Sequence, residues 1–294
     1  SLLKLRGAYT QTNLDTLCQE LGRMREGNGG HLDLSDLAAL EPAALAVLLA
    51  ALGPPREGAL DGFVPPAETA GPACLQTEIL RGLLQGDVGH WHQHPGGKTI
   101  TGSEVFTDHD GIYRALKETA GRLGAIDPLP PIWMAAMHAL GFELTNNVLR
   151  HSEASCGVVV VEIDPASGQL VLAIADSGVG IRRSLARNPD LVETGDLAAI
   201  RSAMAPQATG EPGRGAGMGL FLARKLVRDN GGTLLIRSGT ASRELTPEPM
   251  DTSDRPGLQG TLVVASLKTN SPLDYGRIEQ ELLGPDGVSE AADD

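Results

Sequence analysis

Two apolar runs joined by a turn place the tightest constraint on how this chain of 294 residues can fold. The runs Gly157–Ile163 and Gln169–Ala175 are rich in Val, Leu, Ile and Ala, and Asp164-Pro165-Ala166-Ser167-Gly168 between them favours a turn. This pattern predicts a β-hairpin whose strands lie in a core. Two further apolar strands are expected at Thr233–Arg237 and Gly260–Ser266.

Helical patterns surround these strands. We expect helices at Gly111–Leu123, at Ile132–His151 after a run of prolines, and at Met218–Asp229, where Asn230-Gly231-Gly232 ends the pattern. The stretch His90-Trp91-His92-Gln93-His94 alternates histidines, but glycine and proline surround it and no carboxylate or cysteine is near. We interpret it as a loop and not as a metal site.

The first ninety or so residues alternate between strand and helix patterns. Strands are expected at Leu2–Leu5 and His31–Leu34, and an amphipathic helix opens at Asn13. A second helix is expected at Ala43–Leu52, with Pro42 in its first turn and a glycine just past its end. This alternation is typical of an α/β unit.

Composition excludes several classes of protein. The formal net charge of −13 argues against broad electrostatic binding to nucleic acid or to an anionic membrane. No run reaches the length of a membrane span, and the first residues show no signal peptide. Three widely spaced cysteines, Cys18, Cys74 and Cys156, form neither a disulfide framework nor a zinc pattern, which favours a reducing, cytoplasmic location.

One predicted helix carries polar side chains that need an explanation. Glu143 and Asn147 are four residues apart, and His151 continues the same face, while Leu144 and Val148 lie on the other side. Asn has poor helix propensity, so its place in this stripe is unusual. The stripe is either a solvated face or a site.

Two glycine-rich segments follow elements of the predicted core. Asp176-Ser177-Gly178-Val179-Gly180 comes directly after a strand, where it is either a tight turn or a place for close ligand approach. Gly213-Arg214-Gly215-Ala216-Gly217-Met218-Gly219-Leu220 opens a helix, where it is either a linker or a phosphate cradle. It has neither the Walker spacing nor the dinucleotide-binding spacing. Gln259-Gly260-Thr261, which opens the last strand, is uninformative alone.

In order and spacing, these four segments resemble the nucleotide-binding boxes of the GHKL ATPase superfamily, which includes gyrase, histidine kinases and anti-sigma-factor serine kinases. The resemblance covers roughly residues 104–270. Glu143-x-x-x-Asn147 with Arg150-His151 resembles the N box, and Asp176-x-Gly178-x-Gly180 resembles the G1 box. Gly215-x-Gly217-Met218-Gly219-Leu220 resembles the G2 box, and Gly260-Thr261 resembles the final Gly-Thr strand. Val148 departs from the usual Ala after the metal-binding Asn, and the neighbouring Asn146 leaves the register open, although the face shared with Glu143 favours Asn147.

The resemblance implies a site for ATP and Mg2+. Asn147 would hold the Mg2+ ion, Asp176 would accept the adenine amine with support from Thr261, and Glu143 would be the general base. The stretch from Arg182 to Gly213 would be a lid over ATP. The expected contacts to the remainder of the nucleotide are as follows: Gly178 and Gly180 leave room for base and ribose, Gly215, Gly217, Met218, Gly219 and Leu220 form the phosphate cradle, and Arg150 and His151 contact phosphate.

Within the superfamily, the short N box is most similar to that of anti-sigma-factor kinases. His31-Leu32-Asp33-Leu34-Ser35-Asp36-Leu37 and the following Leu40–Leu45 are similar to STAS domains, the fold of anti-sigma-factor antagonists. In that family a phosphorylated hydroxyl opens the helix, but Glu41-Pro42-Ala43-Ala44 offers none here. The N-terminal part would therefore dock or regulate and would not be a substrate at that position.

The expected fold is α/β. A Bergerat-type ATP-binding domain, with helices layered on a mixed sheet, follows a smaller STAS-like domain. We assign residues 1–95 to the STAS-like domain, 96–103 to a linker, 104–270 to the ATP-binding domain and 271–294 to an acidic tail. The expected function is a cytoplasmic Mg-ATP-dependent regulatory ATPase or serine/threonine kinase. It would act on a protein partner, such as a STAS-type antagonist or a sigma-like regulator, and would form a homodimer. The alternative is an ATP-gated interaction module with little or no phosphoryl transfer.

Overall fold

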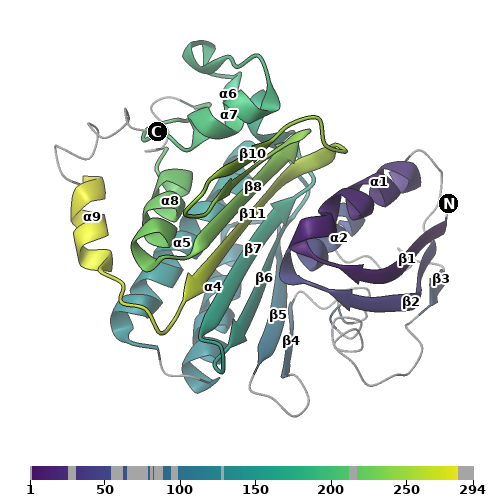
Figure 1. The fold of residues 1–294 in the computed structure, drawn as a ribbon, viewed down its shortest axis with the longest axis horizontal. Coiled ribbons are helices and arrows are strands. Elements are labelled where there is room, and N and C mark those ends of the chain that lie inside the picture. The colour runs from purple at the N-terminus through teal and green to yellow at the C-terminus, as the bar shows by residue number, and fades with distance from the viewer. Residues whose placement is uncertain are drawn as a thin grey trace.

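The computed structural model describes residues 2–25, 31–53, 62–64, 79, 82, 89–93, 99–126, 129–211 and 217–283. A large sheet lies at the centre, helices cover one of its faces, and a smaller α/β unit covers the other (Figure 1). Within these residues no helix combines the length and apolar character that a bilayer crossing requires.

The large sheet has eight strands in the order β10-β9-β8-β11-β7-β6-β5-β4, and every neighbouring pair is antiparallel. The strands are β4 (Gly89–Gln93), β5 (Ile100–Phe106), β6 (Gly157–Asp164), β7 (Gln169–Asp176), β8 (Thr233–Gly239), β9 (Ala241–Leu245), β10 (Met250–Thr252) and β11 (Leu258–Lys268). The predicted hairpin is confirmed as β6 and β7, and the other two predicted strands are β8 and β11. The α/β fold class is confirmed, but the described sheet is antiparallel where we expected a mixed one.

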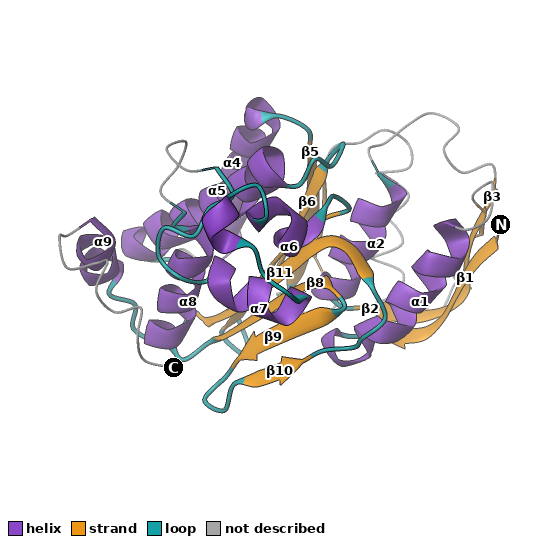
Figure 2. Ribbon diagram, turned by 90° about the horizontal axis from the view of Figure 1, so that it is seen from above, coloured by secondary structure: helices purple, strands orange, loops and turns teal. Residues whose placement is uncertain are grey.

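Helices cover the face of the sheet that carries Val159, Ile174 and Ile236. They are α4 (His109–Ile126), α5 (Pro131–His151), α8 (Gly219–Asn230) and α9 (Tyr275–Leu283). The short elements α6 (Gly180–Leu185), the 3-10 turn Pro189–Leu191 and α7 (Asp196–Ala203) gather at one end of this layer, at the top of Figure 1. Figure 2 looks down on this end. Helix α8 ends at Gly231 in the left-handed conformation, as the Asn-Gly-Gly pattern predicts.

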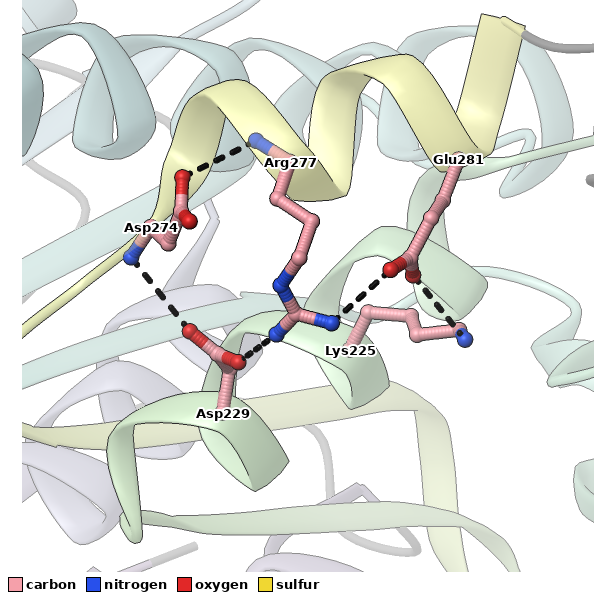
Figure 3. A network of polar contacts seen from close by, with 5 residues as sticks. All are labelled: Lys225, Asp229, Asp274, Arg277 and Glu281. Carbon is pink, nitrogen blue, oxygen red and sulfur yellow. Dashed lines mark hydrogen bonds and ion pairs between the residues drawn. The ribbon is translucent and has the colours of Figure 1, made fainter.

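Helix α9 lies beyond the expected boundary of the ATP-binding domain, in the stretch that we assigned to an acidic tail. A polar network ties it to α8 (Figure 3). Arg277 pairs with Asp229 and with Glu281, and Glu281 also lies 3.3 Å from the Nζ atom of Lys225. The backbone N–H of Asp274 donates to Asp229 at 3.4 Å. Residues up to Leu283 are thus part of the folded domain.

The N-terminal unit has three parallel strands, in the order β1 (Leu2–Tyr9), β2 (His31–Leu40) and β3 (Gly62–Val64). Its helices are α1 (Leu14–Arg25), which follows the 3-10 turn Gln11–Asn13, and α2 (Pro42–Leu52). Helix α2 begins with proline in its first turn and is followed by Gly53 with φ of 81°, as predicted.

Helix α2 joins the two sheets into one core. Nine consecutive residues, Pro42–Ala50, are buried, because one side of the helix packs on its own small sheet and another side contacts β6, β7 and β11. A helix that is apolar all round is expected in such a position. The N-terminal unit therefore covers the face of the large sheet opposite α5 and α8 (Figure 1).

Two sequence interpretations at the edge of the large sheet are wrong. Residues His90–Gln93, which we interpreted as a loop, lie in β4, where Trp91 pairs with Gly102 of β5. Residues 100–103, which we placed in the linker, belong to β5, which pairs with β6 along its length. The reason is tertiary: Gly102 leaves space for the Trp91 ring, and Trp91 donates to Glu104 at 3.2 Å.

Candidate functional site

A pocket on the helix-covered face of the sheet lies between α5, the end of β7, the start of α6, the segment after α7 and the start of α8. Its cavity volume is about 180 Å³. Most of the side chains that the sequence singled out line it together: Glu143, Asn147, Arg150, His151, Asp176, Gly180, Gly217, Met218, Gly219, Leu220 and Thr261. Gly178 lies outside the lining, and Gly215 lies outside the described residues.

Helix α5 supplies the polar stripe. Helical spacing places Glu143, Asn147, Arg150 and His151 along one face, and all four line the pocket. Glu143 is half-buried, and burial raises the pKa of its carboxyl group although the charge of Arg150 opposes the shift. Glu143 forms no hydrogen bond or ion pair with any residue that the structure describes. The result is a carboxylate that is more basic than usual and has room for a ligand.

Asn146 and Asn147 both line the pocket, so the lining alone does not choose between them. Contact with α8 distinguishes them. A Cβ atom at Gly219 would lie 2.7 Å from the Nδ2 atom of Asn147 and 3.5 Å from the Cβ atom of Glu143. Glycine at position 219 therefore lets the first turn of α8 approach the Glu143–Asn147 face closely.

The end of α5 adds charge and an unsatisfied ring nitrogen. Arg150 lies 3.7 Å from Glu211, which also lies 3.9 Å from Arg187. The Nδ1 atom of His151 is buried without a hydrogen-bond partner in the described part of the chain. Burial lowers the pKa of His151, so its imidazole is neutral at physiological pH. A neutral ring with a free nitrogen can bond to a ligand that enters the pocket.

Asp176 is the buried acceptor of the site. Its residue is 5% exposed, at the end of β7 and in register with Thr261 of β11. The backbone N–H of Gly178 donates to its Oδ1 atom at 2.8 Å, and the backbone of Thr261 also bonds to its carboxylate. Burial nevertheless raises the pKa of Asp176 to about 6. The protein thus keeps a costly buried carboxylate at the floor of the pocket.

The glycines near Asp176 have structural roles that differ from the expected ones. A Cβ atom at Gly178 would lie 1.9 Å from the carbonyl oxygen of Ser152, which also accepts a bond from Val179 N–H at 2.7 Å. Gly178 therefore makes room for the end of α5 and not for a ligand. Gly260, with φ of +90°, has the backbone oxygen of Asp176 2.1 Å from its ideal Cβ position. These close approaches fix Asp176 between the end of α5 and β11.

The start of α8 forms the opposite wall. Gly217 has φ of +62° and packs on the backbone of Gln207 and Ala208, while Met218, Gly219 and Leu220 line the pocket. No side chain among the described residues caps this end of α8. Uncapped N–H groups and the helix dipole favour an anion at such a terminus.

Part of the pocket lining was not predicted from the sequence. Ser184, Thr209 and Gly210 come from the stretch that we expected to be a lid, and the lining also includes Ile174, Ile181, Leu185, Ala203, Ala208 and Val263. Strand alternation was an available signal for two of them, since Ile174 precedes Asp176 by two residues and Val263 follows Thr261 by two. Ser184, Thr209 and Gly210 have no comparable signal in the sequence.

Comparison with known families agrees with this geometry. Residues 135–270 match the family model of the histidine kinase-, DNA gyrase B- and HSP90-like ATPases. This stretch is a GHKL-type ATPase domain. It runs from α5 to just beyond β11 and contains every residue that lines the pocket. No curated protein sequence matches the chain significantly.

The lining fits the ATP that this type of domain binds. Asp176 is a buried acceptor for an exocyclic amine, the apolar side chains beside it suit a flat base, and the terminus of α8 suits phosphates. The described residues contain no cluster of three or more His, Cys, Asp or Glu that could hold a metal ion. Asn147 is suited to an ion that takes few protein ligands and several phosphate oxygens, as Mg2+ does.

Proposed function

We propose that this chain is a Mg-ATP-dependent regulatory enzyme, a serine/threonine protein kinase or ATPase of anti-sigma-factor type, that acts on a protein partner. The observation that carries the proposal is one pocket that brings the Glu143–Asn147 face of α5 together with the buried Asp176. Glu143 and Asn147 suit phosphate chemistry, and Asp176 suits recognition of the base.

In this proposal each part of the pocket has a task. The carboxylate of Asp176 accepts the adenine amine, and the first turn of α8 orients the phosphates through its backbone N–H groups. The side-chain oxygen of Asn147 holds Mg2+. When bound, Mg2+ would neutralise phosphate charge. The described pocket lining contains no lysine that could do so. Arg150 and His151 contact phosphate from the end of α5.

Glu143 is the proposed general base. Its raised pKa makes the carboxylate a better proton acceptor, and its place one turn before Asn147 points it to the same part of the pocket. It would take the proton from the attacking hydroxyl of a protein Ser or Thr, or from water. The same group serves kinase and ATPase chemistry alike, so the acceptor depends on the partner.

The test separates binding from chemistry. Calorimetry with ATP, with and without Mg2+, should show Mg2+-dependent binding that Asn147→Ala removes. Glu143→Gln should retain binding, but release of labelled phosphate from ATP should fall by about 10²–10⁴-fold. Glu118→Gln on the exposed side of α4 is the matched control and should behave as wild type. Normal Mg-ATP binding by Asn147→Ala, or wild-type turnover by Glu143→Gln, would refute the assignment of these residues.

A second candidate is an ATP-gated interaction module, and one contact favours it. Behind the nucleotide pocket, Asp176, Ser177 and Gln259 line a small cavity together with Cys18 of α1 and Val47 of α2. The base-binding carboxylate is therefore next to the N-terminal unit. Hydrogen exchange in α1 and α2 should slow when ATP is added, without any labelled phosphate being released. Exchange that is unchanged by ATP would reject this candidate.

The proposal extends to the N-terminal unit and to partners. Parallel strands followed by the apolar α2 support a STAS-like unit that docks or regulates. The partner would be a STAS-type antagonist or a sigma-like regulator in the cytoplasm, and the chain would act as a homodimer. Sedimentation equilibrium tests the dimer: a molecular mass that stays at that of the 30.7 kDa monomer at all concentrations would remove it from the proposal.

A further inference from the structure

A second, larger groove lies on the other side of α8 from α9. Its volume is about 820 Å³, and it is formed by the end of α7 and the turn after it, by the C-terminal half of α8, and by β9 and β10 with their connecting hairpin. None of its lining residues lines the nucleotide pocket.

The charge of the groove is opposite to that of the chain. Four arginines and a single acidic residue line it, namely Arg201, Arg224, Arg228, Arg243 and Asp251, whereas the whole chain carries a formal charge of −13. Asp251 accepts from Arg201 Nε at 3.0 Å and from Arg243 Nη1 at 3.2 Å. One carboxylate therefore serves two guanidinium groups, and the lining keeps three positive charges in excess.

The groove is also partly apolar and incompletely satisfied. Met204, Val227 and Leu245 form apolar parts of the lining, and three prolines, Pro206, Pro247 and Pro249, add rigid edges. The Nε atom of Arg243 and the Oδ1 atom of Asp251 are buried without hydrogen-bond partners in the described part of the chain. Buried polar atoms of this kind are rare in protein interiors.

A lid segment separates this groove from the nucleotide pocket. Ala203 and Ala208 line the nucleotide pocket, whereas Met204, Ala205 and Pro206 between them line the groove. Helix α8 also borders both cavities, because Leu220 lines the nucleotide pocket and Arg224 lines the groove. A segment bound in the groove would therefore touch the wall of the nucleotide pocket.

We propose that this groove is the docking site for an acidic, partly apolar segment of a protein partner. Carboxylates of the segment pair with Arg224 and Arg228 at the edge, and its apolar side chains cover Met204, Val227 and Leu245. The inference rests on the proposed function only for the existence of a partner. Charge complementarity selects an acidic occupant, and the strongly acidic remainder of the chain disfavours nucleic acid.

The probe is a short fluorescein-labelled peptide that alternates aspartate with valine, and its affinity is read by fluorescence anisotropy with the full chain in the absence of nucleotide. The wild type should bind it, and binding should weaken as salt is raised from about 0.05 M to about 0.3 M. The double variant Arg224→Glu/Arg228→Glu should lose at least about tenfold in affinity. Arg114→Glu/Lys117→Glu on the exposed face of α4 makes the same change in net charge and should lose less than about twofold.

The peptide-binding experiment gives a different result for each alternative occupant of the groove. Absence of peptide binding by the wild type, or equal losses in the two double variants, would overturn the proposal. If neutralising Asp286, Glu290, Asp293 and Asp294 tightened peptide binding by about tenfold or more, the occupant would be this chain's own acidic segment and not a partner. The single variant Arg228→Ala, at an exposed position, keeps the test valid if the double variant does not fold. ATP binding is measured separately, so a failure of the nucleotide site is distinguishable from a failure of the groove.

Discussion

Replacing Asp176 with asparagine should make the nucleotide-free protein more stable while it removes ATP binding. The carboxylate is buried at the end of β7, and its pKa is raised from the ordinary 3.8 to about 6, chiefly by burial. Two backbone N–H groups, those of Gly178 and Thr261, offset only part of this cost. A buried charge that lacks full compensation destabilises the folded state, and asparagine removes the charge with little change in shape.

The magnitude follows from the difference in pKa between the folded and unfolded states. Protonation of Asp176 is favoured in the folded state, so this group stabilises the fold most below pH 3.8 and the contribution is lost as pH rises to about 6. The difference corresponds to about 3 kcal/mol at about 1.4 kcal/mol per pH unit. Asparagine accepts fewer hydrogen bonds than a carboxylate, and this loss reduces the gain in the free energy of unfolding by about 1 kcal/mol. A net gain of about 2 kcal/mol is therefore expected at pH 7, and little or none near pH 4.

Urea unfolding of both proteins at several pH values measures this difference, and calorimetry measures ATP binding. Asp164→Asn is the matched control, because Asp164 ends the neighbouring strand β6 but its pKa is lowered by bonds from Ser167 and Ala166. That variant should gain no stability as pH rises. The reasoning would be refuted if Asp176→Asn were less stable than wild type at pH 7, or if its difference from wild type did not vary with pH. Retained ATP binding would refute the role of Asp176 as the base-binding acceptor.

Two further predictions concern the framework around the site. Gly178→Ala should lower the free energy of unfolding by about 3 kcal/mol or more in thermal or urea unfolding, because its Cβ atom would lie 1.9 Å from the carbonyl oxygen of Ser152; a loss below about 1 kcal/mol would show that the end of α5 moves easily. Asp15→Ala in the N-terminal unit should destabilise the chain by about 3 kcal/mol, because Arg237 of β8, whose side chain is 2% exposed, lies 2.6 Å from that carboxylate. Adding Arg237→Met to Asp15→Ala should restore part of the stability, and strictly additive losses would contradict this reading of the pair.

The sequence predicted those parts of the fold that depend on interactions within a single segment of the chain. The β6–β7 hairpin, the polar face of α5 and the glycine end of α8 each follow from spacing within one segment. The same holds for Glu143 and Asn147, because one helix carries both and no tertiary contact is needed to place them together. These residues could be found from the sequence because their neighbours in space are also neighbours in the chain.

Positions that depend on contacts between distant segments could not be found in this way. Ser184 and Thr209 reach the pocket only because α6 and the turn after α7 lie against it. Gly178 was assigned to the ligand, because nothing in the sequence indicates that the carbonyl of Ser152 would occupy the space beside it. Residues 100–103 lie in β5 because β6 pairs with them, and a strand that relies on its partner carries a weak signal of its own.

The burial of α2 limits how the N-terminal unit can regulate the site. Separating α2 from the large sheet would expose apolar side chains that now pack on β6, β7 and β11, at about 1.5–3 kcal/mol for each large one. It would also leave the charge of Arg237 without Asp15. Exposure of a few such side chains approaches the whole stability of a typical domain, about 5–15 kcal/mol. Release of the unit as a rigid body is therefore too costly to act as a switch. Any regulation from this side would have to act through small shifts at the cavity that Cys18 and Val47 line together with Asp176, Ser177 and Gln259.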